Sequence, residues 1–275
     1  MHRRRYRRRM DQRTLDARIQ RYYGGDFDEA ARLTTGAVGR AELARVREVV
    51  SAHLSPGSRV LDVGGGAGAH ATWLAAAGHA VTLVDPVPSH VESARTVGTF
   101  TAELGDARAL VADDASYDAV LLAGPLCHLV TREERVRALR EAARVLRPGG
   151  SVFAVGISRT IAALDAVLRR RFTGLPGPAL VHLLETGEVL DEIRNPEGEF
   201  PGGHFHTGAE LVDELGAAGF RDAWVTGLEG PASLALELSA PDDDVVDAAL
   251  LLARRAEGDR GAADVSSHLL GIATR

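Results

Sequence analysis

Short apolar runs alternate with longer amphipathic stretches along the middle of the chain. Residues 60–63, 80–84 and 152–157 are almost continuously apolar, which is typical of strands buried on both faces of a parallel sheet. Residues 131–146 instead place apolar side chains along one stripe and arginine and glutamate on the rest, which predicts an amphipathic helix. This alternation predicts an α/β protein.

The full pattern predicts seven strands with connecting helices in one doubly wound, mostly parallel, Rossmann-like sheet. Strands are expected near residues 60–63, 80–84, 100–104, 117–128 (with the residues that follow the strand), 152–157, 220–228 and 266–273. Helices are expected near residues 15–23, 40–54, 69–77, 86–97, 131–146, 161–172, 179–190, 207–218 and 241–257.

The chain reads as one domain, 11–275, behind a short basic tail. The regular alternation of strands and helices does not need residues 158–206, so this stretch is expected to be a helical cap. The expected parts are a disordered Arg-rich tail (1–10), N-terminal helices (11–57), the ligand-binding core (58–157), the cap (158–206) and the C-terminal part of the sheet (207–275).

The basic residues are unevenly placed. The segment HRRRYRRR before Met10 can bind nucleic acid or anionic lipid, but a disordered tail, or Met10 as the natural start, is the favoured interpretation. The net charge is −6, and without the arginines of residues 3–9 the remainder is more acidic, which argues against a nucleic-acid substrate. The chain has no lysine, so lysine bases and Schiff bases are excluded.

Cysteine content and hydropathy indicate the compartment. Cys127 is the single cysteine, which excludes an intramolecular disulfide and suggests a reducing cytoplasm. No apolar run reaches the length of a membrane span and no signal peptide is recognised, so we expect no membrane association. A monomer or a homodimer is expected.

A glycine-rich turn follows the first predicted strand. Residues 59–68, RVLDVGGGAG, lead from that strand into a helix, and such a turn brings backbone N–H groups close to a bound nucleotide. The next strand ends in Asp85, at the distance where an acidic side chain reaches a ribose diol. Alone, the turn is also compatible with NAD or FAD binding, or with a packing turn that holds no ligand.

Five motifs in order resemble those of the class I S-adenosylmethionine-dependent methyltransferases. They span residues 59–157, and the first is an acidic residue followed by GxGxG rather than the GxGxxG of dehydrogenases. The motifs are DVGGGAG at 62–68, Asp85 after the second strand, GDA at 105–107, YDAVLLAGPLCH at 117–128, and VLRPGG at 145–150.

The resemblance implies S-adenosylmethionine as the cofactor. It implies that Asp85 accepts from both ribose hydroxyls, that Asp106 accepts from the adenine amino group unless it is only a surface turn residue, and that Asp62 orients the loop or meets the amino group of the methionine moiety. The implied cofactor-binding residues are Asp62, Gly64, Gly65, Gly66, Gly68, Asp85, Pro86, Asp106, Ala107 and Ala123.

Two histidines are the candidate catalytic bases. His128 matches the histidine of a GPLYHL sequence in related methyltransferases, while Cys127 replaces the tyrosine, so His128 is either a base or a wall of the donor site. His206 is the second candidate. No third ligand joins it and His204, so no metal site is expected.

The cap and the N-terminal helices supply the candidate substrate-binding residues. Arg159 and Arg194 are suited to an anionic group, although both are also ordinary surface arginines. Tyr23 is expected to close over the donor or to pack in the core, and His204 to face the substrate or lead into a helix.

These observations favour a metal-independent methyltransferase that acts on a small molecule, by analogy one of specialised metabolism. A protein that binds S-adenosylmethionine without transferring its methyl group, either a cofactor-dependent cyclase or a regulatory module, stays open because its fold would be the same. An NAD-dependent oxidoreductase is disfavoured by the GxGxG spacing.

Overall fold

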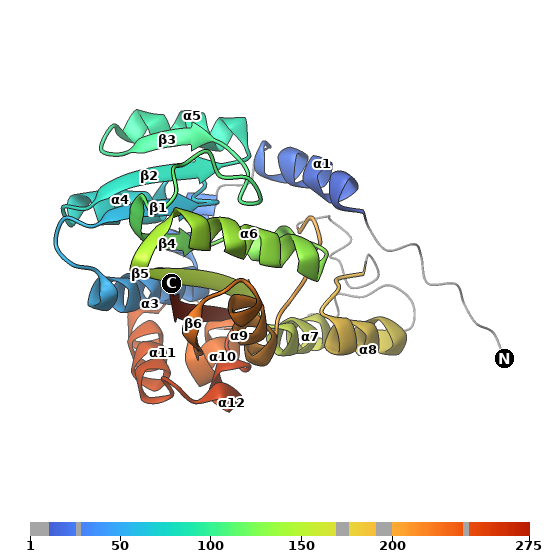
Figure 1. Ribbon diagram of the computed structural model, residues 1–275. Helices are drawn as coiled ribbons and strands as arrows, with labels where there is room; N and C mark the ends of the chain where they lie inside the picture. The colour runs from blue at the N-terminus through green and yellow to red at the C-terminus, as the bar shows by residue number, and fades with distance from the viewer. Residues whose placement is uncertain (1–10, 26–28, 169–175, 191–199, 239–241) are drawn as a thin grey trace.

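A seven-stranded sheet forms the centre of the computed structural model, which describes residues 11–25, 29–168, 176–190, 200–238 and 242–275 (Figure 1). The strand order is β3-β2-β1-β4-β5-β7-β6; β7 is antiparallel to both its neighbours and the other pairs are parallel. The prediction of a doubly wound, mostly parallel sheet is confirmed. The strands are β1 (Arg59–Val63), β2 (Ala80–Asp85), β3 (Thr101–Leu104), β4 (Tyr117–Leu122), β5 (Leu146–Ile157), β6 (Arg221–Gly227) and β7 (His268–Thr274).

Helices cover both faces of this sheet. The helices are α1 (Gln12–Tyr23), α2 (Glu29–Thr35), α3 (Ala37–His53), α4 (Ala69–Ala76), α5 (Pro88–Val97), α6 (Arg132–Val145), α7 (Arg159–Leu168), α8 (Pro176–Thr186), α9 (Gly208–Ala217), α10 (Ser233–Leu238), α11 (Asp243–Arg255) and α12 (Arg260–Ala263), with short 3-10 helices η1 (Pro125–His128) and η2 (Gly230–Ala232). Within the described part of the chain, no helix has the length and apolar character that crossing a membrane requires.

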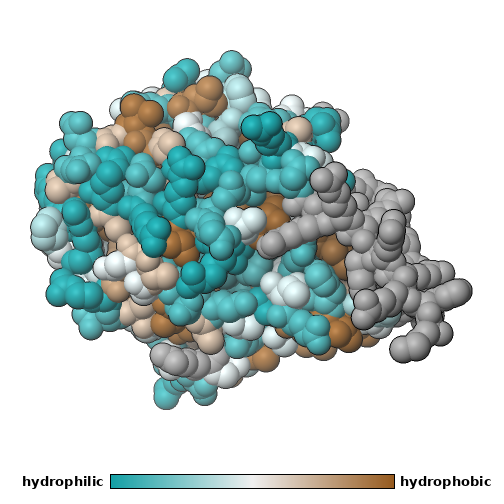
Figure 2. Space-filling view, turned by 45° about the vertical axis from the view of Figure 1, so that its right-hand side comes forward, coloured by the Kyte–Doolittle hydropathy of each residue, from teal (hydrophilic) through white to brown (hydrophobic). Residues whose placement is uncertain are grey.

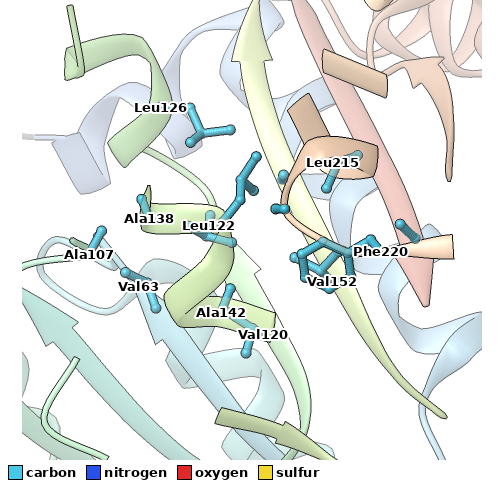
Figure 3. Packing of buried hydrophobic residues seen from close by; sticks show 14 of the residues in the cluster. Val63, Ala107, Val120, Leu122, Leu126, Ala138, Ala142, Val152, Leu215 and Phe220 are labelled. Carbon is cyan, nitrogen blue, oxygen red and sulfur yellow. The ribbon is translucent and has the colours of Figure 1, made fainter. Parts of the chain in front are cut away.

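Two hydrophobic clusters, one on each face, explain why the central strands are apolar throughout. On one face Leu122 and Val152 lie among the helix residues Ala138, Ala142 and Leu215 of α6 and α9 (Figure 3). On the other face α3, α4 and α5 supply the apolar side chains. The central strands β1, β4 and β5 therefore bury both faces, which is the reason for the continuous runs in the sequence.

The start of β5 lies earlier than predicted. Leu146 follows α6 directly and pairs with Tyr117, whereas Ser151 pairs with Ala119, so the residues between bulge out of the ladder. The VLRPGG sequence therefore ends the helix, as expected, but forms an irregular first part of the strand and not a separate turn.

The cap differs from its predicted helices. α8 begins at Pro176 and ends at Thr186, whereas a helix over 179–190 was predicted. Gly187 has a φ of +74°, and the chain then pairs with the returning segment through the bridge of Glu188 with His204. This pairing satisfies the backbone groups that a longer helix would have used.

The sequence interpretation missed three short helices, α2, α10 and α12. α2 lies between glycines that were read as loop. A Cβ at Gly39 would lie 2.1 Å from the Arg32 carbonyl oxygen, so this glycine allows α2 and α3 to pack closely.

The visible face in Figure 2 is mostly hydrophilic, with hydrophobic residues in small separate groups.

Candidate active site

A cavity of about 330 Å³ lies at the carboxyl ends of the first four strands. Its volume is at the lower end of the range for small-molecule sites, and its place is the edge where open α/β sheets bind ligands. α1 covers it from one side. The lining residues are Asp16, Ile19, Gln20, Tyr23, Val63, Gly64, Gly66, Val84, Asp85, Pro86, Val87, His90, Gly105, Asp106, Ala107, Arg108, Ala123, Gly124, Pro125, His128 and Leu129.

The glycine loop brings its backbone to this cavity. Gly64 has a φ of +72°, and a Cβ there would lie 2.8 Å from the Pro125 ring, so only glycine fits. Gly66 lines the cavity and donates its N–H to Asp85 at 2.9 Å. Gly65 and Gly68 do not line it; Gly65 packs on Asp62, and Gly68 is the residue before α4.

Asp85 is buried at the end of β2 and lines the cavity. Its carboxylate accepts from the N–H groups of Gly66 and Val87, at 2.9 and 2.8 Å. His90 Nδ1 lies 3.2 Å from the same carboxylate. A carboxylate has about four acceptor positions and two are taken by these N–H groups, so Asp85 can accept from two hydroxyl groups when His90 Nδ1 carries no proton. The sequence interpretation missed His90, although its position in the first turn of α5, just after Asp85, was a usable signal.

Asp62 lies under the loop and outside the cavity lining. It is 0% exposed, and neither carboxylate oxygen has a hydrogen-bond partner among the described residues. Burial, together with the nearby charge of Asp85, raises the pKa of Asp62 to about 7. A buried carboxylate without a donor is costly, and this one lies directly against Gly65 of the glycine loop.

Asp106 is held by a side chain that the sequence interpretation missed. Arg108 donates to the Asp106 carboxylate from its backbone, Nε and Nη2, the last at 2.6 Å. Burial raises the pKa of Asp106, but the hydrogen bonds and charge of Arg108 outweigh it and lower the pKa. Arg108 also pairs with Asp16 and Glu134, so an adenine contact by Asp106 would share this carboxylate with a cation.

His128 and Tyr23 meet inside the cavity. His128 Nε2 and the Tyr23 hydroxyl lie 3.0 Å apart, and the His128 ring stacks on Phe200 with centroids 5.3 Å apart. Burial lowers the pKa of His128 to about 4, against the opposing effects of the Gly202 backbone and of Asp85. The ring is therefore neutral at neutral pH.

The predicted cap residues lie elsewhere. Arg159, predicted to bind substrate or to lie on the surface, is buried and donates to the carbonyl oxygens of Phe205 and Leu184 and to Glu210. It is outside the cavity because its guanidinium group holds the parts of the cap together. Arg194 lies outside the described residues.

His204 and His206 are also buried away from the cavity, which corrects the prediction that they face a substrate or supply the base. His206 Nε2 lies 3.2 Å from Glu214, whose carboxylate is held by the Arg135 guanidinium at 2.7 Å. Burial lowers the pKa of His206, with Glu214 opposing.

Among the residues that the structure describes, two groups have the residue types of a metal site, which the sequence interpretation did not find. The ligand atoms of His204, His206 and Glu214 lie within 4.8 Å of one another, and so do those of Glu42, Glu229 and His268. In both groups a carboxylate is already paired with arginine, Glu214 with Arg135 and Glu42 with Arg32.

Comparison with known proteins identifies the class. Residues 60–150 match the family described as Methyltransferase domain. An uncharacterized methyltransferase of Mycobacterium tuberculosis is 45% identical over 93 residues, covering 34% of this chain and 37% of that protein. A ubiquinone biosynthesis O-methyltransferase of Xanthomonas oryzae pv. oryzae is 36% identical over 162 residues, covering 54% of this chain and 66% of that protein. The match thus spans little more than a third of the mycobacterial protein.

Solved structures share the fold. A SAM-dependent methyltransferase of Methanosarcina mazei superposes with a TM-score of 0.58 at 22% identity, covering 82% of this chain and 96% of that chain. The cyclase SpnF superposes with a TM-score of 0.50 at 22% identity, covering 84% and 80%. Residues 60–150 of this chain thus match a methyltransferase domain, and the sheet around them has the fold of solved S-adenosylmethionine-dependent methyltransferases.

Proposed function

We propose that the protein transfers a methyl group from S-adenosylmethionine to a small molecule, without a metal ion. The observation that carries this proposal is the arrangement of Asp85 and the glycine loop at one cavity, with the unpaired carboxylate of Asp62 beneath it. The relatives named as methyltransferases support the same reaction class.

The chain's own groups suit each part of this donor. Asp85 offers acceptors to the ribose hydroxyls, and Gly64 and Gly66 leave backbone space for the methionine moiety. Ala107 and the Asp106 carboxylate line the end expected to hold adenine. When bound, S-adenosylmethionine supplies an electrophilic methyl group on a positively charged sulfur. The protein then has to align the acceptor and, for a protonated nucleophile, remove its proton.

We assign the removal of that proton to His128. It lies in the cavity and is neutral at neutral pH because burial lowers its pKa to about 4. Its Nε2 atom faces the Tyr23 hydroxyl, so the proton can pass to the ring directly or through that hydroxyl.

The net charge of the chain and the size of the cavity support a small-molecule acceptor. The position of the histidine and carboxylate groups supports a reaction without a metal ion. The chain carries a net charge of −6 and the cavity is of small-molecule size, which favours a metabolite over a nucleic acid. The histidine and carboxylate groups that resemble metal sites are balanced by arginine and do not line the cavity. With one cysteine in the chain, a reducing cytoplasm is the compartment we propose.

Two experiments test the proposal. Calorimetry should show S-adenosylhomocysteine binding and no NADH binding; the reverse result would support an oxidoreductase. Incubation with methyl-labelled donor and a metabolite extract, with and without EDTA, should label a small molecule equally in both. Donor binding without labelling, across extracts and purified acceptors, would favour the second candidate function, a cyclase or regulatory module. This candidate is considered because the cyclase SpnF has a similar fold.

A further inference from the structure

We propose that Gln12, in the first turn of α1, is a positioning residue that places His128, so that the helix over the donor cavity also assembles the proton-accepting side of the site. This inference rests on the proposed function in one respect, the role of His128 as the proton acceptor. The placement of the ring itself is independent of that role.

Gln12 forms two hydrogen bonds with the backbone of the segment that carries His128. Its Nε2 donates to the His128 carbonyl oxygen at 2.9 Å, and its Oε1 accepts from the Val130 N–H at 2.9 Å. One side-chain amide thus pairs with the backbone on both sides of Leu129, as a neighbouring strand would. Asp16 Oδ1, 2.8 Å from Gln12 Nε2, orients the amide from one helical turn further along α1.

The opposite side of the segment is fixed by the rest of the fold. The Cys127 carbonyl oxygen accepts from the His204 N–H at 2.9 Å. Arg135 Nη1 donates to the carbonyl oxygens of Leu129 and Val130 at 3.0 Å each, and Glu214 holds that guanidinium group. The segment is therefore held on one side by hydrogen bonds from Arg135 and His204 and on the other side by hydrogen bonds from Gln12 of α1.

α1 combines these hydrogen bonds from Gln12 with contacts to the donor cavity. Tyr23 approaches the His128 ring, and Gln20 Nε2 donates to the Pro86 carbonyl oxygen at 2.7 Å. Asp16 pairs with Arg108. Because the same helix lines the donor cavity and holds the His128 backbone, its docked position both covers the donor and sets the direction of the His128 ring.

Burial under α1 also accounts for the state of the ring. The titratable groups that act on His128 are Tyr23 and Asp16 from α1, and Asp85 from β2. Burial is the largest effect and lowers the pKa. Loss of the two Gln12 hydrogen bonds should admit water to the His128 ring. The pKa of His128 should then rise towards the ordinary histidine value.

The test is an NMR titration of the ¹⁵N-labelled His128 ring in the full chain, assigned with a His128→Asn variant. In Gln12→Ala the His128 pKa should rise by about one unit or more from its wild-type value. Gln12→Glu loses the donor to His128 and adds a negative charge near the ring, so the His128 pKa should rise at least as much as in Gln12→Ala. Gln20→Ala is the matched control on the same helix: it should weaken S-adenosylhomocysteine binding and leave the His128 titration as in wild type.

Kinetics provide the second measurement. Gln12→Ala should lower kcat roughly tenfold, in keeping with a misplaced base, while the KM for the donor changes less than about threefold. An unchanged His128 titration in Gln12→Ala would overturn the inference. If wild type binds no S-adenosylhomocysteine, the proposed function fails, while the titration still decides whether Gln12 places His128.

Discussion

The donor side and the cap side of the molecule both bury charged side chains, but the partners of these side chains differ. On the donor side Asp62 has no hydrogen-bond partner among the described residues, and Asp85 is held mainly by backbone N–H groups. On the cap side Arg135 and Glu214 form a bidentate pair, 4% and 2% exposed. The Asp62 carboxylate therefore has unfilled acceptors, whereas protein donors fill those of the Glu214 carboxylate.

This difference separates binding groups from structural ones. A buried carboxylate without a donor costs free energy, which a ligand can recover, whereas a complete pair contributes to the shape of the fold. Glu42, Glu229 and His268 belong with the complete pairs. Burial lowers the pKa of His268, but the charges of Glu42 and Glu229 outweigh it and raise the pKa to about 9, so His268 is positively charged at neutral pH.

The largest expected effect compares a histidine from each side. His128→Ala should lower turnover roughly 10²–10⁴-fold, the usual contribution of a positioned base. His206→Ala should instead lower the melting temperature, because it leaves Glu214 with one partner fewer. A base must be deprotonated to act, and the pKa of His128 is about 4, so the wild-type rate should fall only below about pH 4. A His128→Ala enzyme with normal turnover but poor donor affinity would make this ring part of the cavity wall.

The second prediction breaks the buried pair of Arg135 on α6 with Glu214 on α9. Glu214→Ala should reduce the free energy of unfolding by about 3–5 kcal/mol, because Arg135 would remain buried and unpaired. Asp213→Ala is the matched control on the same helix, since its pair with Arg132 is exposed and should contribute little to stability. Denaturant titration of both variants measures the difference; equal effects would contradict the structural role given to the buried pair.

The third prediction tests the donor side. Asp85→Ala should raise the dissociation constant for S-adenosylmethionine at least about tenfold, because each unsatisfied buried hydroxyl costs about 1–3 kcal/mol. The exposed Asp113, changed to alanine, serves as the control for loss of a negative charge. Calorimetry on folded Asp85→Ala that shows wild-type affinity would remove the ribose assignment.

The smallest effect concerns the unpaired carboxylate itself. Because the pKa of Asp62 is raised to about 7, the folded protein holds this proton more tightly than the unfolded chain, and wild-type stability falls as the pH rises through about 7. Asp62→Asn does not titrate, so it should melt a few degrees above wild type at pH 8, with a smaller difference at pH 5.

The same substitution should weaken donor binding, since the amide carries no negative charge for an ammonium group. Thermal melts without ligand and calorimetry with S-adenosylmethionine separate the two effects. A variant that melts lower than wild type at pH 8 would show that Asp62 is a structural group and would place it with the cap pairs.

The sequence by itself determined the sheet and the donor loop. Continuous apolar runs are dictated by burial on both faces, and Gly64 is dictated by a φ that other residues rarely adopt, so both can be read locally. Asp85 follows in the same way, since it ends the next strand. The cofactor was predicted from motifs of this kind, each made of residues close together in the chain.

Only the tertiary structure decided which charged groups meet. Arg135 and Glu214 are 79 residues apart, and Gln12 and His128 are 116 apart, so no local pattern joins them. The same reason explains the errors at Arg159, His204 and His206, whose partners lie on other elements of the cap and on α9. A side chain's type and spacing set what it can bind, but the packing of helices on the sheet decides whether a protein group or a ligand takes that place.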